Sequence, residues 1–137
     1  MNPLVYIIDD DLVSQFATQY RMKQAIESCA FISFDSAKDG LRTFTDQLTD
    51  GKQLPDILFL DLEMPNMDGW DFLREFNNIY SPNIPTDIYV LSSFSNKELR
   101  KKVSEHPLVK GCFNKPLTKL DVEKILVNKQ NLNTTSG

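Results

Sequence analysis

The feature that most constrains this chain is a fivefold alternation of short apolar runs with amphipathic stretches. The apolar runs are LVYII (4–8), CAFISF (29–34), DILFL (56–60), DIYVL (87–91) and LVKGCF (108–113). Short runs that are apolar almost throughout are typical of parallel strands buried on both faces. Because helical segments separate them, the sequence predicts a three-layer (βα)5 fold, with a parallel five-stranded sheet between two layers of helices.

The stretches between these runs carry apolar residues at helical spacing. Val13, Phe16, Ala17 and Tyr20 predict the first helix. The apolar residues of the later helices are Ala37, Leu41, Phe44 and Leu48; Phe72, Leu73 and Phe76; Leu99 and Val103; and Leu117, Leu120, Ile125 and Leu126. Three pairs resemble helix caps: Ser36 with Asp39, Ser95 with Glu98, and Thr118 with Asp121.

Composition narrows the possible functions. The 137 residues, 41% hydrophobic and 25% charged, fit one globular domain. A net charge of −4 argues against a nucleic-acid or acidic-membrane surface. No secretory signal is recognisable, and no apolar run approaches the roughly 18 residues of a membrane span, so we expect a cytoplasmic protein. The polar segment 129–137 is expected to be a frayed tail, too short for an output domain.

Polar side chains follow four of the predicted strands at their carboxyl ends. They are Asp9, Asp10 and Asp11 after the first, Asp61 after the third, Ser92 and Ser93 after the fourth, and Lys115 after the fifth. Ligands of open α/β sheets bind at this edge, so we expect these groups to converge there. Clustered carboxylates suit Mg²⁺, which would offset their mutual repulsion. With the lysine, such a site could receive a phosphoryl group on a carboxylate.

Each of these residues also has a plainer explanation when taken singly. An aspartate at a strand end is usually a turn residue or a helix cap. A lysine before a proline, as in Lys115-Pro116, is usually part of a solvated loop. Their joint occurrence at the ends of four strands in one chain favours the functional interpretation.

These residues resemble the site of a receiver domain of the two-component response-regulator family, over roughly residues 3–128. The segment LFLDLEMPNMDGW (58–70) is similar to the family's phosphorylation loop. The acidic pair after the first strand, the hydroxyl in VLSS and the KPL after the fifth strand follow in the family's order. The resemblance, closest to chemotaxis-regulator-like receivers, implies a flavodoxin-like fold of strand order 2-1-3-4-5. It also implies a receiver domain over 1–128 that acts as a regulatory phospho-acceptor and not as an enzyme.

The resemblance assigns a role to each member of the acidic cluster. Asp61 is implied to be the phospho-accepting nucleophile. Asp9 and Asp10 are implied to organise Mg²⁺, Asp10 directly and Asp9 largely through water, while Glu63 offers the metal its backbone carbonyl. Asp11 is the surplus acid, and its place before Leu12 predicts a helix N-cap or first-turn acid.

The resemblance also covers the switch and the partners. Ser92 is implied to move onto a phosphoryl oxygen, and Lys115 to pair with Asp61 or its phosphate, with the Lys115–Pro116 bond often cis in the family. The phosphoryl group would come from a sensor histidine kinase or a phosphotransfer protein, and signalling or a phosphorelay would follow through an unidentified downstream protein. In the loop, Pro65 restricts the residue before it, and Gly69 is expected to allow a positive φ.

The chain departs from the family at the position three residues before the lysine, which is usually aromatic. That position is Cys112, and Phe113 cannot replace the aromatic residue because neighbouring strand residues point to opposite faces. A Cys29–Cys112 disulfide is excluded if strands two and five are opposite edges of the sheet. Two further hypotheses are that bulky Phe94 slows dephosphorylation and that His106 is a solvated residue near a helix end.

Three other functions remain as alternatives. A haloacid-dehalogenase-type phosphatase also uses a strand-end aspartate, but it wants Asp-x-Asp where this chain has Asp61-Leu62-Glu63. A degenerate receiver would act as a phosphorylation-independent interaction module, yet no acidic or lysine position is missing. Flavin mononucleotide binding of the flavodoxin type needs a Ser/Thr/Gly-rich loop after the first strand, which is absent from the sequence.

Overall fold

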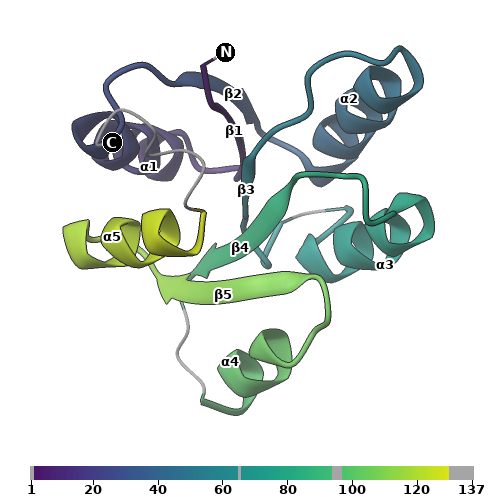
Figure 1. Cartoon of the computed structure of the whole chain (residues 1–137). Helices are drawn as coiled ribbons and strands as arrows, with labels where there is room; N and C mark the ends of the chain where they lie inside the picture. The colour runs from purple at the N-terminus through teal and green to yellow at the C-terminus, as the bar shows by residue number, and fades with distance from the viewer. Residues whose placement is uncertain (1, 65, 94–96, 130–137) are drawn as a thin grey trace.

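The computed structural model describes residues 2–64, 66–93 and 97–129. Its strands are β1 (Leu4–Ile8), β2 (Ala30–Phe34), β3 (Ile57–Leu60), β4 (Asp87–Ser92) and β5 (Val109–Asn114). Its helices are α1 (Leu12–Ala25), α2 (Ala37–Thr49), α3 (Gly69–Ile79), α4 (Lys97–Ser104) and α5 (Lys119–Asn128). The strands form one parallel sheet in the order β2-β1-β3-β4-β5 (Figure 1). The predicted flavodoxin-like (βα)5 fold is confirmed.

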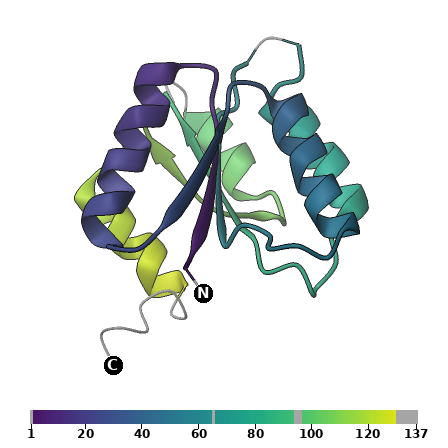
Figure 2. The ribbon, with the colours of Figure 1, turned by 90° about the horizontal axis from the view of Figure 1, so that it is seen from above.

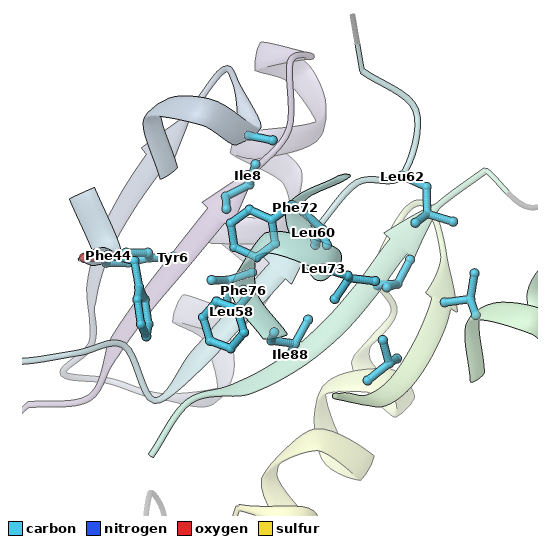
Figure 3. Packing of buried hydrophobic residues seen from close by; sticks show 14 of the residues in the cluster. Tyr6, Ile8, Phe44, Leu58, Leu60, Leu62, Phe72, Leu73, Phe76 and Ile88 are labelled. Atoms are coloured by element: carbon cyan, nitrogen blue, oxygen red, sulfur yellow. The ribbon is translucent and has the colours of Figure 1, made fainter. Parts of the chain in front are cut away.

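The sheet separates two hydrophobic cores. Figure 2 shows α1 and α5 on one side of the sheet and α2 and α3 on the other. The larger core lies under α2, α3 and α4 and contains a group of fully buried aromatic rings, Tyr6, Phe44, Phe72 and Phe76 (Figure 3). The smaller core lies under α1 and α5 and includes Val5, Ile7, Phe59 and Ile125. The central strands β1 and β3 are buried along their whole length, as their apolar sequences predicted.

Helix α1 is confirmed, but of the residues that predicted it Val13, Phe16 and Tyr20 lie on its outer side, together with Leu12, and Ala17 is half-buried. Leu12, Val13, Phe16 and Tyr20 are exposed by 73%, 78%, 73% and 56%. The residues that α1 buries are Gln15, Thr18 and Met22. In α5, Ile125 is buried as expected, whereas Leu120 is 60% exposed. Spacing alone therefore identified these helices without showing which face packs on the sheet.

The predicted caps are present where the structure describes them. Ser36 accepts a hydrogen bond from the amide of Asp39, and Thr118 forms a reciprocal capping box with Asp121. Pro65, Phe94 and Ser95 lie outside the described residues. The predictions for Pro65, for Phe94 and for the cap of Ser95 with Glu98 therefore stay predictions. After the end of α5, the ammonium group of Lys129 reaches the start of β4, where its Nζ lies 3.4 Å from Oδ2 of Asp87. Among the described residues, no helix has the length and hydropathy needed to cross a bilayer.

Candidate functional site

The carboxyl ends of β1 and β3 bring two aspartates together. The amide of Asp61 donates a hydrogen bond to the carbonyl of Ile8 (3.0 Å), one step past the end of β3. The amide of Asp9 donates in the same way to Phe34 at the end of β2 (3.0 Å). Carboxylate oxygens of Asp9, Asp10 and Asp61 all lie within 4.8 Å of one another. The structure thus brings the acidic residues predicted from the sequence into one cluster.

Asp9 is buried, and both of its carboxylate oxygens are already occupied. Oδ1 accepts the amide of Asp11 at 2.9 Å, and Oδ2 accepts the hydroxyl of Ser14 at 2.5 Å. Oδ2 also lies 2.8 Å from Nζ of Lys115. The side-chain amide of Gln15 donates to the backbone carbonyl of Asp9 at 2.6 Å. The first turn of α1 therefore holds Asp9 at two points, Ser14 at the carboxylate and Gln15 at the backbone carbonyl.

Asp61 is also buried but has fewer partners. Its Oδ2 lies 3.2 Å from Nζ of Lys115, and its Oδ1 accepts a long hydrogen bond of 3.3 Å from the amide of Glu63. Burial raises the pKa of Asp61, which Lys115 counteracts and the charge of Asp9 reinforces. Burial alone would lower the pKa of Lys115, but hydrogen bonds and charges from Asp9 and Asp61 outweigh it and leave this pKa raised. One ammonium group thus serves two buried carboxylates.

Asp10 and Asp11 differ from the buried pair. Asp10 is exposed, and its carboxylate has no recorded hydrogen bond or ion pair with another described residue. This carboxylate can therefore bind a ligand without breaking such a contact. Asp11 is the N-cap of α1, and its side chain accepts the amide of Val13 at 3.0 Å. The predicted capping role of Asp11 is confirmed. The acidic run after β1 therefore divides into two members of the cluster and one helix cap.

The fourth and fifth strands supply the remaining groups. Ser92 is buried at the end of β4, and its carbonyl accepts the amide of Lys115 at 3.1 Å, which ties the two strand ends together. The Lys115–Pro116 bond is cis, as the resemblance implied.

The side chain of Glu63 is exposed. The cluster of Asp9, Asp10 and Asp61 has excess negative charge and only hard oxygen donors, which suit a cation such as Mg²⁺.

The expectation that Gly69 has a positive φ is wrong. In the described part of the chain, positive φ angles occur at Asn66 (67°) and Gly51 (68°). Gly69 is required for a different reason: an added Cβ would lie 2.6 Å from the carbonyl oxygen of Asp61 and 2.7 Å from the Cα of Leu62. The backbone at the start of α3 therefore packs directly on the backbone of the candidate nucleophile.

Three residues near the acidic cluster, Ser14, Gln15 and Asp68, were not anticipated from the sequence. Ser14 and Gln15, which hold Asp9, lie among the α1 residues that had no apolar pattern to mark them. Asp68 forms a capping box with Asp71 at the start of α3, and the D-x-x-D spacing is the signal that could have revealed it. These contacts anchor the two helices that begin beside the acidic cluster.

Residues near β5 follow the predicted geometry. Cys112 is buried in the core under α4, whereas Phe113 packs in the core under α5, so the two do point to opposite faces. Both cysteines are free, and β2 and β5 are opposite edges of the sheet. His106 lies just beyond α4, where it is half-buried and its Nδ1 accepts the amide of Leu108 at 3.2 Å. It is thus less solvated than expected, and burial lowers its pKa.

The strand order and the polar groups at the carboxyl edge of the sheet define a doubly wound α/β protein with its site in the usual place for that class. Within this class the chain belongs to the response regulator receiver domain family, whose family model matches residues 5–127. Receiver domains are regulatory phospho-acceptors of two-component systems. The resemblance noted in the sequence is thereby confirmed.

The chain is also similar to several known proteins. Histidine kinase CKI1 of Arabidopsis thaliana is 31% identical over 86 residues, covering 55% of this chain and 7% of that protein. This chain therefore spans only a small part of that relative's length. A two-component response regulator from Cytophaga hutchinsonii has a TM-score of 0.84 at 22% identity, covering 95% of this chain and 98% of that one. The Mn²⁺-bound form of response regulator Rcp1 has a TM-score of 0.68 at 20% identity, with 96% of each chain covered. Both structures share the fold.

Proposed function

We propose that Asp61 is the phospho-acceptor of a Mg²⁺-dependent receiver. The observation that carries this assignment is the contrast between the two buried aspartates. Both oxygens of Asp9 are occupied at 2.5–2.9 Å, whereas Asp61 has one 3.2 Å contact and one 3.3 Å hydrogen bond. A nucleophile needs a lone pair that is free to attack, so Asp61 suits that role and Asp9 suits a supporting one.

The proposed transfer uses a phosphohistidine of a sensor kinase or phosphotransfer protein as donor. A carboxylate oxygen of Asp61 attacks the phosphorus, the new P–O bond forms as the P–N bond breaks, and the leaving imidazole takes up a proton. Lys115, already 3.2 Å from Asp61, neutralises charge on the transferring oxygens. Asp10 and Asp61 would hold Mg²⁺ directly, Asp9 through water and Glu63 through its carbonyl. Mg²⁺ would stabilise the negative charge that develops on the phosphoryl group.

The proposed switch follows from the burial of Ser92. Ser92 ends β4, the strand that pairs with β3, and Asp61 directly follows β3 at the same edge of the sheet. After phosphorylation, the Ser92 hydroxyl donates to a phosphoryl oxygen, and the end of β4 moves with it. Cys112 stands where the family usually has an aromatic residue, so the movement is passed on without that ring. We place the receiver unit at residues 1–128, and a cytoplasmic location belongs to the same proposal.

The exposed apolar residues of α1 indicate where the phosphodonor docks. Leu12, Val13, Phe16 and Tyr20 form a stripe, here called the α1 stripe, that begins one residue after Asp11. An exposed group of large apolar side chains is typical of a protein–protein contact. A donor histidine that reaches Asp61 must bring its own domain over this edge of the sheet. We therefore infer that an apolar surface of the donor covers the α1 stripe.

The test of the phospho-acceptor is the intact mass after incubation with Mg²⁺ and acetyl phosphate. The wild type should gain the mass of one phosphoryl group, and Asp61→Asn should gain none. Asp46→Asn, on the exposed side of α2, is the matched control and should be phosphorylated like the wild type. Absence of phosphorylation in the wild type would instead support the phosphorylation-independent interaction module.

A further inference from the structure

A groove runs between α3 and α4, outside the acidic cluster. One hollow of about 480 Å³ is lined on the α3 side by Trp70, Arg74, Asn77 and Asn78, and on the other side by Lys102 and His106. The four α3 residues follow helical spacing and so form one face of that helix. A second hollow of about 470 Å³ shares Trp70 and adjoins the loop after Asp61. These two hollows together are called the α3–α4 groove.

Positive charge is concentrated in the segment that contains α4, the helix that contributes Lys102 to this groove. The segment 97–110 holds five basic residues against two acidic ones, a net charge of +3, in a chain whose net charge is −4. Lys101, Lys102 and Lys110 are exposed and have no carboxylate within ion-pair distance among the described residues. Arg74 pairs with Asp71, yet its side chain stays 70% exposed. This local charge is opposite to that of the molecule as a whole.

Trp70 links the two hollows. Nζ of Lys102 lies 5.1 Å from the centroid of the Trp70 ring, a cation–π contact between α3 and α4. Beyond Trp70, the second hollow is lined by the apolar residues Leu62, Met64 and Leu99 together with the acidic residues Glu63 and Asp68. The groove therefore has a basic end between the helices and an apolar end near the phosphorylation loop. Tryptophan and arginine are enriched among the residues that anchor protein interfaces, and here Trp70 is half-buried while Arg74 is exposed.

The chemistry of the groove favours one kind of occupant. Small-molecule sites are enclosed and mainly apolar, whereas this groove is open and polar at one end. Nucleic acid requires a broad positive surface, but Glu63 and Asp68 line the apolar end. We propose that the α3–α4 groove binds an acidic segment of a partner protein. Its carboxylates would face Arg74 and Lys102, and an apolar side chain would lie over Trp70 toward Leu99.

The same geometry connects docking with the switch. Leu62, Glu63 and Met64, which line the second hollow, directly follow Asp61 in the sequence. A change of the loop on phosphorylation alters the apolar end of the groove, and by reciprocity an occupied groove alters phosphorylation. This regulation rests on the function proposed above. The docking itself does not, so the two can be tested separately.

Docking is tested by fluorescence, because Trp70 is the only tryptophan of the chain. The probe is a synthetic peptide that joins two leucines to a run of glutamates, titrated without Mg²⁺ or phosphodonor. We expect a saturable change with a dissociation constant on the order of 100 µM, in the range of weak transient contacts. The double variant Arg74→Glu, Lys102→Glu should bind at least about tenfold more weakly. The matched control, Lys119→Glu with Lys124→Glu on α5, makes the same charge change and should bind like the wild type.

Three results would overturn the proposal: no saturable change, equal binding of a peptide with lysines in place of the glutamates, or tighter binding of an oligothymidylate. A second readout guards against altered fluorescence in the variants. The side-chain amide signals of Asn77 and Asn78 in ¹H–¹⁵N spectra should shift on peptide binding in the wild type and in the α5 control. Adding acetyl phosphate and Mg²⁺ then tests the regulation: an unchanged affinity would reject the coupling and leave the docking intact.

Discussion

The ammonium group of Lys115 lies 3.2 Å from the Asp61 carboxylate and is shared with Asp9, from which it is 2.8 Å away. With Asp10 within 4.8 Å, three carboxylates face one ammonium group. Two like charges about 4 Å apart cost roughly 4 kcal/mol at an effective dielectric of 20. The site therefore carries excess negative charge, which under the proposed function a divalent cation would offset.

The first prediction is that Asp61→Asn raises the melting temperature of the metal-free protein at pH 7. Burial raises the pKa of Asp61 above its ordinary value of 3.8, so the folded state holds this proton more tightly than the unfolded state. As the pH rises past 3.8, ionisation of Asp61 therefore lowers the free energy of unfolding. The asparagine side chain of Asp61→Asn has the same shape but does not ionise, so the variant avoids this loss. Thermal unfolding in a chelating buffer measures the shift, with Asp46→Asn as the control. A lower melting temperature for Asp61→Asn would show that Lys115 outweighs burial.

The second prediction separates the members of the acidic run by Mg²⁺ titration. Asp10→Asn should abolish binding, because Asp10 is the exposed carboxylate of the cluster. Asp11→Asn should bind Mg²⁺ nearly as the wild type does and lose at most about 1 kcal/mol of stability, because asparagine also caps helices. Isothermal calorimetry measures both. Equal losses of Mg²⁺ affinity would mean that Asp11 belongs to the metal site.

The third prediction concerns Gly69. Gly69→Ala should lower the free energy of unfolding by about 1–3 kcal/mol and slow phosphorylation, since its Cβ would lie 2.6 Å from the backbone oxygen of Asp61. Gly111→Ala is the matched control, because its Cβ would lie 3.3 Å from a side-chain atom of Tyr89 and meet no backbone atom this closely. We expect the control to change stability by less than about 1 kcal/mol. Urea unfolding of both variants decides the matter, and equal effects would contradict the close approach at Gly69.

The strands were predictable because a buried parallel strand leaves its signature in consecutive residues. Leu4–Ile8 and Ile57–Leu60 are apolar at every position and buried at every position. The site was predictable for a related reason: the ends of such strands meet at one edge, so Asp9 and Asp61 had to lie close together. The strands need only their own boundaries, whereas the site also needs the strand order 2-1-3-4-5, which the family resemblance implied and which makes the first and third strands neighbours.

The packing of α1 was not predictable, because two requirements compete on the same helix. Helical spacing indicates burial for Phe16 and Tyr20, yet both are exposed, while Gln15 is buried. Gln15 is buried because its amide reaches the Asp9 carbonyl, a contact that depends on the three-dimensional position of β1. The role of Gly69 was missed for the same reason. Gly69 packs against the backbone of Asp61, and no local sequence pattern reveals how close these two residues lie in the fold.

The fourth prediction is that the Cys29 thiol reacts slowly in the folded protein. Burial, with a smaller effect from Asp56, raises the pKa of Cys29 to about 11, although Lys23 acts in the opposite direction. At pH 8 its thiolate fraction is therefore roughly a hundredfold below that of a free cysteine. Alkylation of the Cys112→Ser variant with iodoacetamide isolates Cys29, and its rate should rise about tenfold from pH 8 to pH 9. A rate equal to that of the urea-unfolded chain would contradict the raised pKa.

The fifth prediction tests the α1 stripe as the docking surface of the phosphodonor. Phe16 is 73% exposed, so Phe16→Ser should leave the free energy of unfolding within about 0.5 kcal/mol of the wild type. Phosphorylation by a histidine phosphotransfer protein should fall about tenfold at subsaturating receiver, because the apolar contact made on docking is lost. Phosphorylation by acetyl phosphate should not change, since that donor needs no protein surface.

Val127→Ser provides the matched control for this fifth prediction. Val127 is 68% exposed and lies near the carboxyl end of α5, at the opposite end of that helix from its N-cap Thr118. This variant should accept phosphate from both donors at the wild-type rate. If Phe16→Ser slowed both donors equally, the residue would act through the geometry of the acidic cluster. If it slowed neither, the donor would approach Asp61 without covering α1, and the exposed stripe would have to serve a different partner.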